Sequence, residues 1–408
     1  AIMLDGVARD EIYETRLALL PGLDFLLRVD ALALLFLTLS AVLWLLTTIY
    51  AIRYLGNSPH LSRFFGFFSL CVAATTGIAL SGTLITFFIF YELLTLATWP
   101  LVVHRGNDES MAAGSRYLGY TLAGSAVLLI GIVWLESLTG PIEFDRPGQL
   151  VGLDPAALQA IFWLLIAGLG VKAAIVPLHG WLPSAMVAPA PVSALLHAVA
   201  VVKAGAFGIV RIIYDVYGTG LVFELGAGLP LALVASFTII YGSMLALQQS
   251  DIKRRLAYST VSQVSYIVLG ASLFGPFATI GGLVHLVHQG LMKITLFFAA
   301  GAFAERMHAY RVTDLAGAGR SMPWTAAAFT IAALGMIGVP PIAGFISKWC
   351  LGVGAVQGGF IWVIPVLIGS SLLNAAYFLP VVYRLWFAPD SGRADPGSEG
   401  PPWLIAPA

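Results

Sequence analysis

Four lysines interrupt segments of the sequence that are otherwise almost wholly apolar. They are Lys172, Lys203, Lys293 and Lys348, and the chain has only one further lysine among its 21 lysines and arginines. A charge inside a membrane-spanning segment is rare and is usually functional. Unlike arginine, a buried lysine can give up its proton near neutral pH. The pattern therefore predicts that these four lysines exchange protons, with snorkelling of their ammonium groups to the membrane surface as the alternative.

Glu92 is the only acidic residue well inside an apolar segment, TLITFFIFYELLTLATWPLVVH. A lone buried carboxylate is costly unless it is paired or protonated. We therefore predict that Glu92 faces one of the buried lysines. The alternative is a protonated carboxyl group that forms a hydrogen bond to a neighbouring helix.

Three histidines share apolar segments with the lysines: His197, His285 and His288. His285, His288 and Lys293 fall on one broad stripe of a predicted helix, and His197 precedes Lys203 by six residues. Histidine titrates near neutrality, so the arrangement suits a proton relay. A metal site is the alternative, but the sequence offers two ligands and no evident third. The histidines could also be polar contacts between helices.

Two predicted spans carry helix-breaking residues close to a lysine. Residues 157–187 include Lys172, Pro177, Gly180 and Pro183, with Pro189 and Pro191 just beyond. Residues 324–355 include Gly338, Pro340, Pro341 and Gly344, followed by Lys348. Proline removes backbone hydrogen bonds, and transporters place ion sites where helices are interrupted within the membrane. We predict two broken helices that contribute to an ion pathway, against the alternative of simple proline kinks.

The composition predicts an all-α polytopic membrane protein. Hydrophobic residues make up 59% of the chain and charged residues 10%, whereas a soluble domain has about 25% charged residues. The apolar runs predict about eleven spans: 31–52, 64–81, 83–103, 117–138, 157–187, 191–213, 229–248, 256–273, 277–304, 324–355 and 361–387. The spans do not alternate in polarity as the strands of a membrane barrel would.

The chain offers no cofactor-binding motif. Its two cysteines, Cys71 and Cys350, are too few for a four-cysteine iron–sulfur site, and no nucleotide-binding loop is present. We expect no cofactor, metal or nucleic acid to be bound, so that energy must come from an ion gradient or a partner protein. The chain begins with Ala1, and Pro401-Pro402-Trp403-Leu404 resembles the start of another span, so we expect both ends to continue.

The basic residues predict the orientation in the membrane. Twelve are expected on one side: Arg53, Arg63, Arg105, Arg116, Lys253, Arg254, Arg255, Arg306, Arg311, Arg320, Arg384 and Arg393. Five are expected on the other: Arg9, Arg16, Arg28, Arg146 and Arg211. Because basic loops stay inside, the first side is predicted to be cytoplasmic.

The two broken spans lie five spans apart and so predict a repeat. We divide the chain into an outward segment with a first span at 1–63, five-helix units at 64–213 and 229–387, an outward loop at 214–228, and a tail at 388–408. An odd number of spans per unit inverts the second unit in the membrane. Each unit is then expected to open towards the opposite face.

Five segments resemble one family of membrane proteins: YELLTLATWPL, VKAAIVPLHGWLPSAMVAPAPVSALLHAVAVVKAGAFGIVRI, SDIKRRLAYSTVSQVSYIVLG, HLVHQGLMKITLFFAAGAF and GVPPIAGFISKW. They are similar to antiporter-like subunits of respiratory complex I, large subunits of multisubunit cation/proton antiporters, and membrane subunits of energy-converting hydrogenases. The resemblance implies a glutamate–lysine pair, a central lysine and histidine axis, and a terminal lysine or glutamate. The matching residues are Glu92, Lys172, Lys203, His285, His288, Lys293 and Lys348.

The chain also departs from that family. Full-length members usually have fourteen spans, and the long lateral helix of one member has no counterpart here. Lys348 stands where one branch has glutamate, and Ser184 where aspartate is common.

The resemblance implies a proton-translocating subunit of a multisubunit complex in the inner, cytoplasmic membrane, driven by partner subunits. The alternatives are a subunit of a sodium/proton antiporter, with sodium carried through partners, or of an inorganic-carbon uptake system. A membrane anchor without transport would not need four buried lysines.

Overall fold

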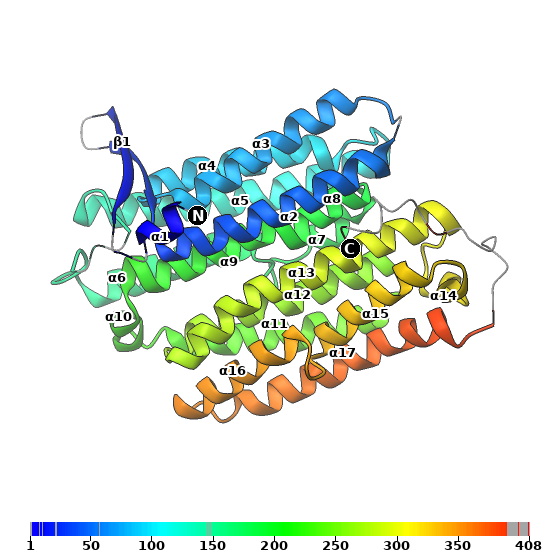
Figure 1. Ribbon diagram of the computed structural model, residues 1–408. Helices are drawn as coiled ribbons and strands as arrows, with labels where there is room; N and C mark the ends of the chain where they lie inside the picture. Colours follow the sequence, from blue (N-terminus) through cyan, green and yellow to red (C-terminus); the bar gives the residue numbers. More distant parts are fainter. Residues whose placement is uncertain are drawn as a thin grey trace.

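The computed structural model describes residues 2–7, 9, 11–20, 23–56, 58–144, 146, 148–389, 399 and 407. Long helices lie side by side along most of this chain, as predicted for an all-α membrane protein (Figure 1). The N-terminal part is an exception, because a short helix α1 (Ile2–Val7) precedes an antiparallel hairpin of β1 (Tyr13–Leu20) and β2 (Leu23–Val29). The sequence analysis did not predict this hairpin.

The first half of the bundle follows the hairpin. Its long helices are α2 (Ala31–Leu55), α3 (Leu61–Leu80), α4 (Leu84–Val102), α5 (Asp108–Thr139) and α6 (Pro155–Lys172). Side chains that accept hydrogen bonds from first-turn amides define where four of them begin: Asp30, Thr83, Asn107 and Asp154. The predicted boundaries differ from the observed ones mainly at these capped ends, because a helix can begin at a polar residue before its apolar run.

The span predicted at 191–213 is less regular than expected. It consists of α8 (Ala190–Ala194), the π-helix η2 (Leu195–Val199), α9 (Val201–Arg211) and a second π-helix, η3 (Ile212–Tyr217). Ahead of it lie the short α7 (Trp181–Ser184) and the 3₁₀ turn η1 (Ala185–Val187), and after it α10 (Thr219–Glu224). π-Helical turns often occur at functional sites, and η2 contains His197.

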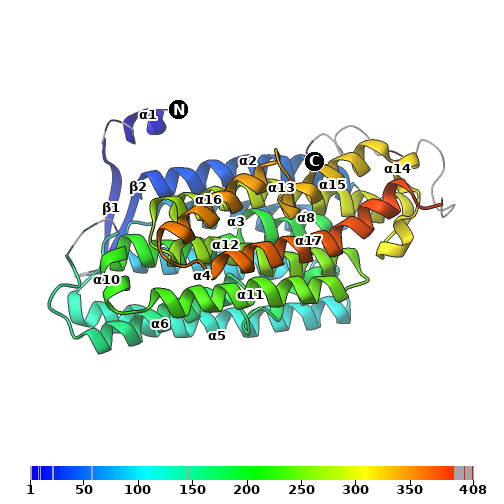
Figure 2. The same ribbon diagram turned by 90° about the horizontal axis from the view of Figure 1, so that it is seen from below.

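The second half contains α11 (Gly228–Gln248), α12 (Ile252–Ser272), α13 (Pro276–Met307), the 3₁₀ turn η4 (Val312–Leu315), α14 (Ala318–Ser321), α15 (Pro323–Ile337), α16 (Ala343–Gln357) and α17 (Val363–Trp386). α13 is central, because it contacts α2, α8, α12, α15 and α16. Figure 2 shows α5 and α11 running along the lower edge of the bundle.

Nine helical segments in the described residues are long and apolar enough to cross a membrane. The chain is thus a multi-pass membrane protein. Two predicted spans fall outside these nine: α12, which is more polar, and the broken pair α15 and α16, whose halves are short. The count of eleven spans and the inverted repeat stay predictions.

One end of the bundle holds a cluster of ion pairs. There, Arg16 and Arg28 pair with Glu143, and the buried Arg211 pairs with Asp30 and Asp215. Burial acts to raise the pKa of Glu143, but the two guanidinium groups bring it below its usual value. At the other end, the backbones of Asp251 and Arg311 form an isolated antiparallel β-bridge. Arg393 and residues 401–404 lie outside the described residues.

Candidate functional site

The first helix break follows Lys172, the last residue of α6. Residues 173–180 form turns, and Ala174 has a left-handed φ of 57°. The Val171 carbonyl accepts a hydrogen bond from Trp181 Nε1 at 2.7 Å, and the amide of Val176 donates to Thr238 Oγ1 at 3.2 Å. Irregular backbone inside a membrane requires such protein partners. Pro177 lies in the break, whereas Pro183 lies within α7 rather than in the break.

Lys172 points from α6 towards α4. Its side chain is 1% exposed, its Nζ donates to the Tyr91 carbonyl, and Nζ lies 3.3 Å from the centroid of the Tyr91 ring. Glu92, the next residue, accepts a hydrogen bond from Ser125 Oγ of α5. In the described part of the chain no ion pair joins Glu92 to Lys172. The structure thus places the two predicted partners beside each other on α4 and α6 without closing the pair.

Lys203 lies in the centre of the bundle, on α9. It is fully buried, and its Nζ donates to the Leu286 carbonyl of α13. A Cβ atom at Gly290 would lie 2.3 Å from this Nζ, so any larger residue at this position would displace the ammonium group. His197 is also fully buried, with its ring 4.7 Å from that of Phe297, and no described residue forms a hydrogen bond to its ring nitrogens.

The predicted stripe on α13 divides between two neighbouring helices. His285 Nδ1 shares a hydrogen bond of 2.8 Å with Ser347 Oγ of α16. Lys293 Nζ donates instead to the Leu256 carbonyl at 3.0 Å and to Ser259 Oγ at 2.7 Å, both on α12. His288 is only partly buried. Among the described residues, the three side chains share a helix but no hydrogen bond joins them, because their spacing covers too wide an arc for one neighbouring helix.

The second helix break separates α15 from α16 and contains Gly338, Pro340 and Pro341. Gly338 has φ of 91°, which favours glycine. From α16, Lys348 reaches back across the break, and its Nζ donates to the carbonyls of Met336 at 3.1 Å and Ile337 at 2.9 Å. It also donates to Ser371 Oγ of α17 at 3.0 Å. The lysine thus caps the carbonyl end of α15, which has no intrahelical donors.

A polar chain that the sequence analysis missed connects Lys293 to the second break. Tyr377 OH lies 2.8 Å from Ser259 Oγ, the partner of Lys293, and 2.7 Å from Asn374 Oδ1. Asn374 Nδ2 donates to the Met336 carbonyl at 3.1 Å, which is also a partner of Lys348. An asparagine in the middle of an apolar helix was the available indication, since buried amides in membranes need partners.

The fifth lysine, Lys253, also reaches a backbone carbonyl. Lys253 is half-buried at the start of α12, and its Nζ donates to the Ala188 carbonyl at 2.6 Å, in the loop between η1 and α8. Among the described residues no group of three or more histidines, cysteines, aspartates or glutamates could hold a metal ion. Cys71 and Cys350 are both unbridged.

Comparison with known proteins identifies the family. Residues 81–373 match the model described as NADH:quinone oxidoreductase/Mrp antiporter, TM, and residues 22–65 match complex I, chain 5 N-terminus. The chain therefore belongs to the antiporter-like membrane subunits of this family.

Individual relatives come from several assemblies. The chain is 36% identical to NADH-quinone oxidoreductase subunit N of Desulforudis audaxviator, over 91% of this chain and 74% of that protein. It is 33% identical to hydrogenase-4 component B of Escherichia coli, over 80% of this chain and half of that protein. A chain in the structure of the Mrp complex from Dietzia sp. superposes with a TM-score of 0.85 at 27% identity, covering 99% of this chain and 75% of that one.

Proposed function

We propose that the chain conducts protons as one subunit of a larger membrane complex, and that it carries out no redox chemistry itself. The observation that carries this proposal is the set of four buried lysines, each of which donates only to carbonyl or hydroxyl oxygens or lies over an aromatic ring. A buried ammonium group without an anionic partner is costly. Such a group readily exchanges its proton, whereas a structural charge would be paired.

The proposed pathway runs along the bundle from Lys172 through Lys203 and the α13 residues to Lys348. Bringing Glu92 into contact with Lys172 would stabilise the ammonium group, and separating the two would release its proton towards Lys203. Moving one charge against 100 mV costs about 2.3 kcal/mol, and a tenfold change in proton affinity corresponds to about 1.4 kcal/mol. A hundredfold change at Lys172 would therefore suffice for one proton.

Lys348 is the proposed release group. Residues 324–355 run from the arginine-rich end of the bundle towards the other end, so Lys348 lies beyond the break on the side away from the basic loops. The inverted-repeat hypothesis assigns the two breaks to opposite faces of the membrane. We propose the cytoplasmic membrane as the location, with the arginine-rich end inside.

The relatives support a multisubunit assembly but not one particular assembly. Their printed names include a quinone oxidoreductase, a hydrogenase and an Mrp complex. A sodium/proton antiporter or an inorganic-carbon uptake system is the second candidate. Sodium prefers several oxygen ligands, and Glu92 is the one carboxylate well inside the predicted spans, so we propose that any sodium passes through partner subunits.

Replacing Lys172 with methionine tests the proposal, because methionine keeps the volume and removes the titratable group. The native assembly carrying Lys172→Met should be purified with its partners, reconstituted in vesicles, and assayed for proton uptake with a fluorescent pH indicator. We expect transport to fall by about a hundredfold, the usual contribution of a positioned proton-transfer group, with subunit composition unchanged. Arg53→Met is the control, and normal pumping by Lys172→Met would refute the proposal.

A further inference from the structure

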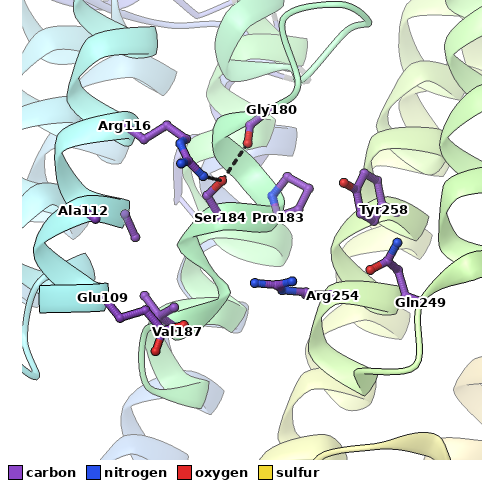
Figure 3. Close-up of a pocket in the computed structure, with 11 residues that line it drawn as sticks. Glu109, Ala112, Arg116, Gly180, Pro183, Ser184, Val187, Gln249, Arg254 and Tyr258 are labelled. Atoms are coloured by element: carbon purple, nitrogen blue, oxygen red, sulfur yellow. Dashed lines mark hydrogen bonds between the residues drawn. The ribbon is translucent and has the colours of Figure 1, made fainter. Parts of the chain in front are cut away.

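A polar cleft lies at the arginine-rich end of the bundle, outside the proposed proton pathway. It has a volume of about 350 Å³ and lies between α5, α7 and the start of α12 (Figure 3). The polar side chains that line it are Glu109, Arg116, Ser184, Gln249, Arg254 and Tyr258. Most of these come from the ends of helices, so the cleft lies at the end of the bundle.

Two guanidinium groups dominate the charge of this cleft. Arg116 Nη1 donates to Ser184 Oγ at 2.8 Å, as Figure 3 shows. No ion pair is formed by Arg116 or Arg254 within the described ranges. Glu109, at the edge of the cleft, is the one acidic residue in its lining. The cleft therefore holds one more positive than negative charge and has guanidinium groups able to bind an anion.

An apolar groove adjoins this cleft on the lateral face of the bundle. It has a volume of about 610 Å³, lies between α5 and α6, and is lined by Arg116, Gly119, Tyr120, Ala123, Gly124, Val127, Ala167, Val171 and Leu178. Arg116 lines both the cleft and the groove. Gly119 leaves the groove open, because a Cβ atom there would have no other heavy atom within 4 Å.

We propose that one phospholipid with an anionic headgroup binds here, its phosphate against Arg116 and Arg254 and an acyl chain in the groove. Guanidinium groups bind phosphate through paired, charge-assisted hydrogen bonds. Basic pockets at the cytoplasmic side of membrane helices suit anionic lipid headgroups. The two features are arranged as the parts of a lipid are. The charged cleft lies at the end of the bundle, and the apolar groove continues from it along the helices.

A helix of a partner subunit fits these features less well. Such a helix is about 10 Å across with its side chains, and would cover the groove without filling the recessed polar cleft. A lipid headgroup can enter the cleft while its chain occupies the groove. The lipid would also contact Gly124 and Val171, which are the neighbours of Ser125 and Lys172 in the sequence.

Lipid titration of the purified assembly, followed by native mass spectrometry, tests this inference. The probes are phosphatidylglycerol, phosphatidylcholine and inorganic phosphate. Wild-type protein should bind phosphatidylglycerol in preference to phosphatidylcholine. Arg254→Gln should weaken binding about tenfold or more, since a hydrogen bond to a charged group is lost. Arg53→Gln, a change at the end of α2 and outside the cleft, is the matched control.

The groove is tested separately by Gly119→Leu, whose Cβ meets no other heavy atom and whose longer side chain would occupy the groove. Gly66→Leu on α3 is its control, because Gly66 also has open space around its Cβ position. Thermal unfolding of each variant excludes misfolding as the cause of a change. The inference is overturned if Gly119→Leu binds phosphatidylglycerol as wild type does, if phosphatidylcholine binds equally well, or if inorganic phosphate alone competes fully. A cysteine introduced by Gly119→Cys that crosslinks to a partner polypeptide in the native assembly would likewise overturn it.

Discussion

The two helix breaks use a lysine in different ways. At the first, Lys172 ends α6 and points away from the break, to the carbonyl and ring of Tyr91 on α4. At the second, Lys348 follows the break and returns to it, donating to two carbonyls at the end of α15 and to Ser371 Oγ. The first lysine is 1% exposed and the second 8%.

This difference separates two roles that a buried lysine can have. Trp181 satisfies a carbonyl at the first break, so Lys172 is not needed to hold the backbone and can respond to Glu92. Lys348, by contrast, itself donates to the backbone carbonyls of the second break. We infer that a change at Lys172 affects mainly transport, whereas a change at Lys348 affects both transport and the stability of the break.

The largest expected effect is on transport by Lys348→Arg. Arginine can supply donors to the carbonyls but stays protonated, so the variant should assemble normally and lose proton translocation by about a hundredfold. Proton uptake by reconstituted vesicles is the measurement, with subunit composition as the control for assembly. Near-wild-type pumping would remove Lys348 from the pathway and leave release to a partner subunit.

A double-mutant cycle tests whether Glu92 acts through Lys172. Glu92→Gln and Lys172→Met should each slow transport, and the double variant should be little worse than Lys172→Met alone. Groups that act as a pair show coupling of about 0.5–3 kcal/mol. Transport rates of the four proteins give this coupling directly, and additive losses would mean that Glu92 and Lys172 do not act as a pair.

A smaller effect is expected on stability, where replacing the lysine at the second break should cost more than replacing the lysine at the first. Lys348→Met leaves the Ile337 carbonyl without the donor that the structure gives it, at a cost of about 1–3 kcal/mol. Lys172→Met should cost less, because the Tyr91 carbonyl also accepts from Thr95 Oγ1 at 3.2 Å. The free energy of unfolding in detergent measures both, and equal losses would contradict the proposed difference between the breaks.

The smallest effect concerns the ring beside Lys172. The Tyr91 hydroxyl has no hydrogen-bond partner among the described residues, so Tyr91→Phe should leave stability and transport unchanged. Tyr91→Leu removes the cation–π contact, which is worth about 0.5–2 kcal/mol, and should alter the pH dependence of transport. Identical pH profiles for the phenylalanine and leucine variants would show that the ring does not influence Lys172.

Local sequence was enough to predict the long helices and the two interruptions. Apolar runs of sufficient length must be helical in a membrane, because every backbone group needs an internal partner there. Helices cannot continue through Pro177 in the first break or through Gly338, Pro340 and Pro341 in the second. The same apolar context made each buried lysine stand out, since charge is rare in such segments.

Tertiary packing alone decided which oxygen each lysine meets. The stripe of His285, His288 and Lys293 was evident on one helix, but the rotation of α13 against its neighbours sends His285 to Ser347 and Lys293 to Ser259. The link through Tyr377 reaches Ser259, 118 residues earlier in the chain, and Asn374 continues it to Met336 on a third helix. Sequence spacing along one helix constrains its own faces, whereas the contact across a helix interface depends on two helices at once, so only the folded bundle determines it.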